Sequence, residues 1–330
     1  MFLLEIFSLT LTQMLMIFSL IITGFLLRKT NIVGEEAVKV LSRVETYALV
    51  PALTFNNFMG KCTVENFTRY YSLMFYGLGV ITVSVILAYL ISGFFVKYDG
   101  INPELKYKRN IYKYSLTFGN FGFMGNFIIL GIWGDMEFFK YSMFTFFINM
   151  TCNIWGLLVL IPDGEEKPSI KATVAKAITA PPVLAVLFGI LAGLFNLSYY
   201  LPDFIKSALS GAGGCMCPIA MLLAGIVIGG YRIKDILKEK KVYILSLLRL
   251  IVLPGVFITL LTLLKAPSDV LIFTLVAFAT PLGLNTIIYP ATYGGETKTG
   301  AAMNMISNTF SVITIPLIYY FFIELLPKII

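Results

Sequence analysis

The chain is a succession of apolar stretches, each about as long as a helix that crosses a lipid bilayer. The hydrocarbon core of a bilayer requires about 20 predominantly apolar residues per helix. We therefore predict an all-α integral membrane protein with ten transmembrane helices. The predicted spans cover residues 4–27, 37–59, 70–96, 111–133, 138–161, 173–195, 204–230, 242–264, 269–293 and 299–325.

Composition supports this class of protein. Only 13% of the residues are charged, 58% are hydrophobic, and the mean hydropathy is +0.86. A soluble domain carries about a quarter charged residues, so we expect the surface of this chain to contact the lipid bilayer. The net charge of +7 does not indicate a nucleic-acid partner, because the basic residues lie between apolar stretches rather than on one tail or face.

The positions of the basic residues predict the orientation. The connections that follow odd-numbered helices together carry 17 Lys and Arg, whereas the opposite connections and the C-terminus carry six. Connections rich in Lys and Arg stay in the cytoplasm. We therefore expect both termini to lie outside, in a multi-pass protein of the cell membrane (a plasma or inner membrane).

The longest polar connection divides the chain into two halves. It covers residues 162–171 and separates a five-helix repeat at 1–161 from another at 172–330. Because five is an odd number, the second repeat must insert upside down relative to the first, as in transporters with inverted repeats. The fourth and ninth helices also end alike, with an aromatic residue followed by Gly134 and Gly294, respectively.

Two predicted helices are interrupted at matching places in the halves. Glycine and proline break helices, and asparagine in hydrocarbon is costly unless it has a partner. Matched interruptions indicate the substrate site of a transporter, where helix N-termini and amide donors suit an anionic group. The residues assigned to this site are Gly119, Asn120, Gly122, Gly125 and Asn126 in the first interruption, and Thr280, Pro281 and Asn285 in the second. The alternative is that the glycines pack helices closely and the asparagines bond between helices.

Other polar residues inside predicted spans are secondary candidates. Asn149 with Asn153 in the fifth helix, and Asn308 with its polar neighbours in the tenth, are expected either to line the same cavity or to make packing hydrogen bonds. Arg249 lies inside the eighth helix, where an arginine is a functional candidate. It also lies near a basic connection, so the alternative is that its side chain snorkels to the cytoplasmic surface.

Several residue types are absent or peripheral. The chain contains no histidine, and its four cysteines are scattered, so we expect no metal, no cofactor and no enzyme activity. None of the 18 acidic residues falls at the centre of a predicted span, and Arg43 and Glu45 are assigned to the cytoplasmic end of the second helix. Because carriers of protons or sodium generally use a buried carboxylate, this pattern argues against a cation exchanger.

Several motifs together resemble the auxin efflux carrier family, in order along nearly the whole chain. They are Gly24-Phe-Leu-Leu-Arg28, Leu41-Ser-Arg43, Val50-Pro51-Ala-Leu-Thr-Phe55, Phe118-Gly-Asn-Phe-Gly-Phe-Met-Gly125, Leu248-Arg-Leu-Ile-Val-Leu-Pro254, and Thr280-Pro281 followed by Asn285 and Tyr293-Gly294. The resemblance implies a ten-helix carrier of organic anions that forms a homodimer. It implies a scaffold of helices 1, 2, 6 and 7, and a transport domain of helices 3–5 and 8–10 that moves like an elevator.

The resemblance also implies that the broken helices 4 and 9 cross, with Asn120 and Asn285 near the substrate. One departure stands out, because family members usually have proline at the position of Phe127. We therefore expect the first break to depend on Gly119, Gly122 and Gly125 alone, with Asn126 and Phe127 beside the pocket.

These features predict a secondary transporter of a small organic anion, such as a dicarboxylate or an auxin-like acid. Two alternatives remain. One is a sodium-coupled carrier of the bile-acid type, which would show sodium-dependent uptake. The other is a membrane receptor that keeps the carrier fold, binds its ligand and does not transport it.

Overall fold

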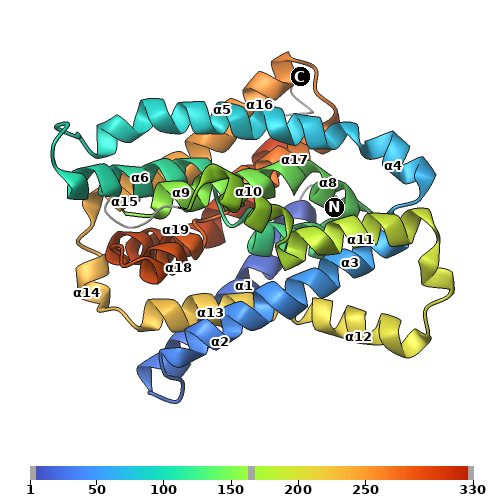
Figure 1. Ribbon diagram of the computed structural model, residues 1–330. Helices are drawn as coiled ribbons and strands as arrows, with labels where there is room; N and C mark the ends of the chain where they lie inside the picture. The colour runs from blue at the N-terminus through green and yellow to red at the C-terminus, as the bar shows by residue number, and fades with distance from the viewer. Residues whose placement is uncertain (1–4, 163–167, 326–330) are drawn as a thin grey trace.

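The computed structural model describes residues 5–162 and 168–325, and every regular element in these two ranges is helical (Figure 1). The α-helices are α1 (Glu5–Lys29), α2 (Glu36–Val44), α3 (Val50–Lys61), α4 (Val64–Tyr70), α5 (Ser72–Phe95), α6 (Pro103–Thr117), α7 (Asn126–Trp133), α8 (Asp135–Thr151), α9 (Leu157–Leu160), α10 (Ile170–Ile178), α11 (Pro181–Leu194), α12 (Asp203–Gly214), α13 (Met216–Gly229), α14 (Ile233–Ile236), α15 (Lys240–Leu247), α16 (Leu253–Leu263), α17 (Ser268–Ala279), α18 (Asn285–Thr292) and α19 (Lys298–Tyr319). Five-residue π-helical turns join several of these: η2 (Glu45–Leu49), η3 (Phe121–Gly125), η4 (Cys152–Gly156) and η6 (Leu248–Val252). A six-residue π-helix, η7 (Tyr320–Leu325), follows α19, and a single 3₁₀ turn, η5 (Leu197–Tyr199), follows α11.

The described helices are long and apolar enough for a multi-pass membrane protein. Seven qualify by length and composition, and an eighth does if α10 and α11, which meet at a bend of 50°, form one span. The seven are Phe7–Lys29, Val64–Phe95, Pro103–Trp133, Asp135–Leu160, Asp203–Gly229, Lys240–Leu263 and Lys298–Ile323. The prediction of an all-helical membrane protein with several transmembrane helices is therefore confirmed.

Every predicted span overlaps described helices, including the two that lie outside these seven spans and the bent pair. The predicted span 37–59 is one helix built from α2, η2 and α3, and 269–293 is α17 followed by α18. The largest boundary difference is at α6, which begins at Pro103 rather than at 111. There the Asn102 side chain accepts the backbone N–H of Glu104 at 2.9 Å, and the proline occupies the first turn, which together start a helix. Half of the predicted connection 162–171, residues 163–167, lies outside the described residues, and α10 begins at Ile170 within the rest of it.

One group of helices packs through small residues. α1 runs along α13, where a Cβ added at Gly24 or Gly225 would collide with the backbone carbonyl of Leu222 or Ile21. α3 packs against α11, where a Cβ at Gly189 would lie 2.7 Å from the Cβ of Phe58. Helices associate in lipid by such close backbone approach rather than by hydrophobic burial.

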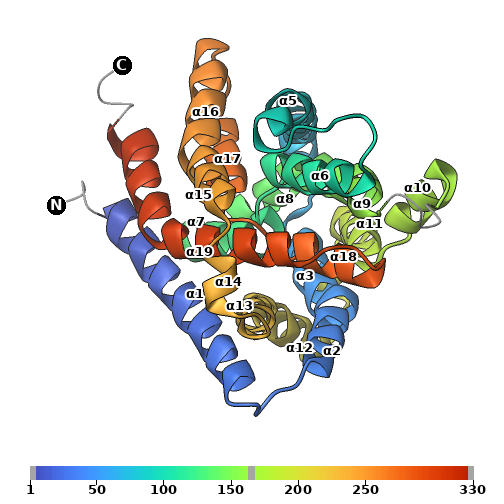
Figure 2. The ribbon, with the colours of Figure 1, turned by 90° about the vertical axis from the view of Figure 1, so that its left-hand side faces the viewer.

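The remaining long helices form a second group around the two interrupted segments. α5 packs against α6 and α8. α15 packs against α19, and α16 packs against α17. In Figure 2, α1, α2, α3, α12 and α13 lie on one side, α5, α6, α8, α16 and α17 on the other, and α19 runs between them. The groups touch where α19 meets α1 and where α3 meets α8; at the latter contact, Asn57 donates to the carbonyl oxygen of Asp135 at 3.0 Å.

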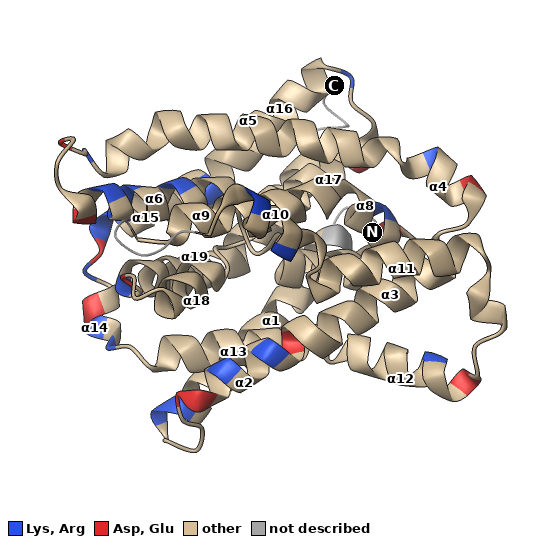
Figure 3. Ribbon diagram, in the orientation of Figure 1, with Lys and Arg blue, Asp and Glu red and all other residues tan. Residues whose placement is uncertain are grey.

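Basic side chains gather at one end of the molecule. Figure 3 shows Lys and Arg concentrated where α2 begins and where α6 and α14 lie. The opposite end, with the connections after α3 and α11, shows fewer of them. This distribution agrees with the count of charges along the sequence.

Glu45, which the sequence places toward the cytoplasmic end of the second helix, is buried in the structure. Glu45 begins the π turn η2, and its side chain is only 1% exposed, whereas Arg43 is exposed. Two residues apart on a helix point to different faces, and the face of Glu45 is covered by α11, α12 and α13, which pack against η2.

Candidate binding site where two broken helices meet

The first break lies between α6 and η3. α6 ends at Thr117, and Phe118 has extended backbone angles (φ −116°, ψ 135°) before the chain turns helical again at Phe121. Gly119 alone of the three predicted glycines lies in this break, because Gly122 and Gly125 belong to the helical turn η3. Phe127 packs partly buried against the core in α7.

The second break lies between α17 and α18. α17 ends at Ala279, Thr280 is extended (φ −71°, ψ 146°), and helix resumes at Asn285. A residue that precedes proline is driven out of the helical region by the proline ring, so Pro281 explains where this break begins.

The two breaks touch each other directly, and we call the place where they meet the crossing. The backbone N–H of Asn120 donates to the carbonyl oxygen of Pro281 at 2.7 Å. A Cβ added at Gly119 would lie 2.7 Å from Oγ1 of Thr280 and 2.9 Å from Nη2 of Arg249. Glycine is therefore required at 119 by close approach, which is what the packing interpretation expects for this residue.

Side chains of α19 form hydrogen bonds with the backbone of the second break. Oγ of Ser307 accepts the backbone N–H of Leu282 at 2.9 Å, and the Asn304 side chain donates to the carbonyl oxygen of Leu282 at 2.7 Å. These side chains replace helical hydrogen bonds that the break removes, so they stabilise an irregular backbone inside the helix bundle.

Arg249 reaches the crossing from the π turn η6. Its side chain is 0% exposed, so the snorkelling alternative is wrong. Nη1 points to the carbonyl oxygen of Leu116 at 3.5 Å, and the guanidinium lies 4.7 Å from the ring centre of Phe278. Nε has no hydrogen-bond partner, and none of the described carboxylates interacts with the guanidinium. Arg249 is thus a buried cation next to both breaks without a counter-ion.

Asn120 lies at the crossing, directly before the π turn η3. Its backbone carbonyl accepts from Met124 and Gly125, both at 3.0 Å. The residue is 6% exposed, and its side chain makes no capping hydrogen bond to the turn that follows. Nothing lies within 4 Å of a Cβ added at Gly122, so open space lies next to this turn.

Asn285 is engaged in a buried network instead. Its Nδ2 donates to the hydroxyl of Tyr114 at 3.0 Å and lies 3.6 Å from Sγ of Cys152. The Tyr114 hydroxyl and the Cys152 thiol are 3.2 Å apart. The sequence did not indicate Tyr114 or Cys152, because a single tyrosine or cysteine in an apolar stretch resembles any core residue.

The remaining predicted residues bond mostly within their own helices. Asn149 donates to the carbonyl oxygen of Thr145 at 3.1 Å, and Asn308 donates to that of Asn304 at 2.8 Å. The Thr280 hydroxyl donates to the carbonyl oxygen of Ala277 at 3.1 Å. A side chain at Gly125 would collide with the Tyr141 hydroxyl. Asn126 lies half-buried at the start of α7.

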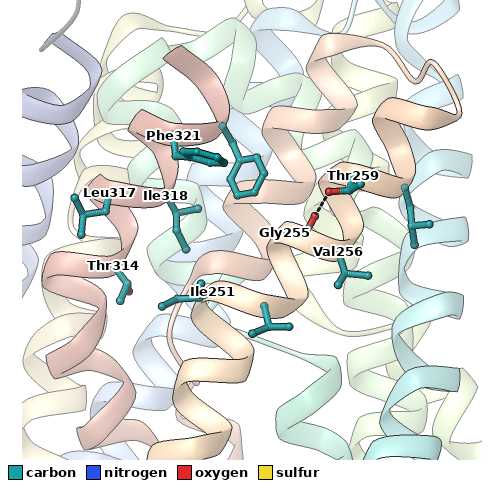
Figure 4. A pocket seen from close by; sticks show the side chains of 11 residues that line it. Ile251, Gly255, Val256, Thr259, Thr314, Leu317, Ile318 and Phe321 are labelled. Carbon is teal, nitrogen blue, oxygen red and sulfur yellow. Dashed lines mark hydrogen bonds between the residues drawn. The ribbon is translucent and has the colours of Figure 1, made fainter. Parts of the chain in front are cut away.

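A cavity of about 790 Å³ is lined by residues of η6, α16, the end of α19 and η7 (Figure 4). Its lining is apolar except for Thr259 and Thr314, and the Thr259 hydroxyl is bonded to the carbonyl oxygen of Gly255 at 2.8 Å. This cavity contains no group that would recognise a charged molecule, so the crossing of the breaks remains the candidate site.

Comparison with known proteins assigns the family. No curated protein matches the chain. Residues 9–173 and 168–319, which together cover nearly the whole chain, match the family described as membrane transport protein. This match confirms the resemblance carried by the motifs, and the chain belongs to the membrane transport protein family, the family of the auxin efflux carriers.

Proposed function

We propose that this membrane transporter is a secondary carrier of a small organic anion that works by alternating access. The observation that carries the proposal is Arg249, a fully buried guanidinium beside two helix breaks with no carboxylate partner among the described residues. Membership of the family shows that the protein is a membrane transporter. The crossing adds a buried cation, Arg249, that an anion would neutralise.

An unpaired buried charge is costly. The effective penalty for burying an ion in a protein is several kcal/mol unless a counter-charge and hydrogen bonds offset it. A bound carboxylate would supply the counter-charge to Arg249 and would accept a hydrogen bond from the Asn120 amide. The positive end of the α18 dipole also lies at the break, since α18 begins at Asn285.

We further propose the ten-helix inverted repeat. Both broken segments end in an eight-residue α-helix, α7 in the first half, where it follows the π turn η3, and α18 in the second. α7 ends directly before Gly134 (φ 82°), and α18 ends one residue before the corresponding glycine, Gly294 (φ 67°). A φ in this range favours glycine, so the two segments use the same stop at corresponding places. This correspondence supports a common origin for the two repeats.

The packing also suggests which parts move. We propose that the group containing α1, α3, α11 and α13 is the scaffold and forms a homodimer, and that the group around the two breaks is the transport domain. In an elevator motion the domains slide along the contacts of α19 with α1 and of α3 with α8. The distribution of basic residues supports placing both termini outside the cell membrane.

Uptake by purified protein in liposomes tests the proposal. We expect saturable uptake of a labelled dicarboxylate or aromatic carboxylate, lowered at least about tenfold by Arg249→Gln, which corresponds to about 1.4 kcal/mol of lost binding. Arg43→Gln is the matched control, because Arg43 is exposed. Asn120→Ala should also lower uptake, while Asn149→Ala, which loses a bond within its own helix, should not.

Four results would contradict the proposal. Folded protein that transports no acid removes the transport function, and an acid that binds without crossing the membrane favours the receptor alternative. Wild-type uptake by Arg249→Gln removes the site assignment. Uptake that requires sodium favours the bile-acid-type carrier.

A further inference from the structure

Glu45 is a buried carboxyl group that the crossing of the breaks does not use. It begins η2, the π turn inside the α2–α3 helix, and is 1% exposed. Neither Oε1 nor Oε2 has a hydrogen-bond partner among the described residues. π turns inside α-helices frequently occur at functional sites. A π turn that carries an unpartnered buried acid is therefore a candidate functional position.

No cation faces this carboxyl group. Of the elements packed against η2, α11 carries no ionisable side chain, and α12 carries only Asp203 and Lys206 in its first two turns, 3.4 Å from each other. From α13, the thiol of Cys217 lies near enough to interact electrostatically with Glu45. The exposed Cys215 is at the junction of α12 and α13.

The charged residues of its own helix point elsewhere. Glu36, Lys39 and Arg43 of α2 are all exposed, and Lys61 is at the far end of α3. Glu45 therefore has no ion-pair partner on any packed element of the described chain. An ionised carboxylate in such a place is strongly disfavoured, whereas the neutral acid is tolerated.

We propose that Glu45 is a proton-binding site of the transporter, occupied in the conformation of the structure and emptied when water reaches η2 during the transport cycle. On release, the O–H bond of the carboxyl breaks, the electron pair stays on the carboxylate, and the proton passes to water. The ligand is a proton rather than a metal cation, because α11 and the buried face of α13 present no carboxylate or amide oxygen beside Glu45. This inference rests on the proposed function for its role in transport, but the binding of the proton itself does not.

Thermal stability tests proton binding without any substrate. Because the folded protein favours the protonated form more than the unfolded chain does, stability must fall as the pH rises and the site loses its proton. We expect the Tm of the wild-type protein to fall by several degrees between about pH 5 and about pH 9. Glu45→Gln, which is neutral at every pH, should remove that part of the fall. Glu36→Gln, on the exposed face of the same helix, is the matched control and should retain it.

Transport tests the role of the proton. Uptake by the wild-type protein should change with pH, by up to about tenfold per unit for a single-proton step, and Glu45→Gln should show no such dependence. Replacement of sodium by choline at fixed pH should leave uptake unchanged.

Three results would overturn the inference: the same pH dependence of Tm in Glu45→Gln and wild type, the same pH dependence of their uptake, or a requirement for sodium that Glu45→Gln abolishes. If neither protein transports, the proposed function fails, and the Tm comparison alone still decides whether Glu45 binds a proton. If Glu45→Gln does not fold, Glu45→Met is the second neutral variant, with the same expected and contradicting results.

Discussion

Gly119→Ala is the sharpest test of the crossing, because the structure predicts what the added methyl group would meet. It would lie 2.7 Å from Oγ1 and 2.8 Å from the carbonyl oxygen of Thr280, and 2.9 Å from Nη2 of Arg249. Ordinary contacts of a Cβ begin at about 3.4 Å, so the backbone of Thr280 must retreat by about 0.6 Å. Overpacking of this kind costs about 1–3 kcal/mol.

The displacement also reaches the hydrogen bond that joins the breaks. Pro281 follows Thr280 directly, and its carbonyl oxygen accepts the N–H of Asn120 at 2.7 Å. A weakened backbone hydrogen bond adds about 0.5–1.5 kcal/mol. The two contributions together predict a loss of about 2–4 kcal/mol, which corresponds to a fall in Tm of roughly 5–10 °C. Arg249 is displaced as well, so the apparent affinity for the transported anion should fall.

Gly122→Ala is the matched control, since both glycines belong to one motif. No heavy atom lies within 4 Å of a Cβ at Gly122, and the residue is helical. Alanine is favoured over glycine in a helix by up to about 1 kcal/mol, so this variant should keep or raise the wild-type Tm. Scanning fluorimetry of both proteins in the same detergent makes the comparison. Equal Tm values for the two variants would refute the close approach of the breaks as the reason for glycine at 119.

Three further substitutions test neighbouring contacts. Ser307→Ala leaves the backbone N–H of Leu282 without its partner at 2.9 Å. It should lower the free energy of unfolding by about 1–3 kcal/mol, measured as a fall in Tm. An unchanged Tm would mean that α19 does not support the break. Tyr114→Phe removes the hydroxyl that accepts from Asn285 at 3.0 Å; it should cost about 1–2 kcal/mol, and the freed Asn285 amide should change substrate affinity more than maximal rate in liposome uptake. Gly225→Ala places a Cβ against the carbonyl oxygen of Ile21, so it should separate α1 from α13 and lower Tm by several degrees. Gly60→Ala is the control, because the added Cβ there meets nothing within 4 Å.

The sequence predicted the helices well because membrane spans depend on local properties. Length, apolar composition and the positions of proline are enough to place each segment, and Pro281 locates the second break to within a residue. The first break was placed less accurately. Three glycines at regular spacing were equally plausible breakers, but only Gly119 meets the backbone of a distant segment. Gly125 is small because Tyr141 packs on it, and that contact depends on tertiary structure.

The roles of the polar residues were harder to predict for the same reason. Asn120 and Asn285 look equivalent in the sequence, yet the Asn285 side chain has partners on α6 and η4 while the Asn120 side chain makes no capping hydrogen bond to η3. Glu45 looked like an ordinary residue of a helix end, since it lies near Lys39 and Arg43. Its burial arises from the faces of α11, α12 and α13, which local pattern cannot supply.

Arg249 and Glu45 are the two buried Asp, Glu, Lys or Arg side chains among the described residues, the fold leaves both without a counter-charge there, and they lie in different groups of helices. Each is costly when charged and alone. The guanidinium cannot lose its proton in practice, so only a bound anion can neutralise it, whereas the carboxyl group becomes neutral by binding a proton. Binding an anion and a proton therefore removes both penalties at once, one in each group. A carrier that moves only when its buried charges are neutralised would then be expected to move the organic anion together with a proton.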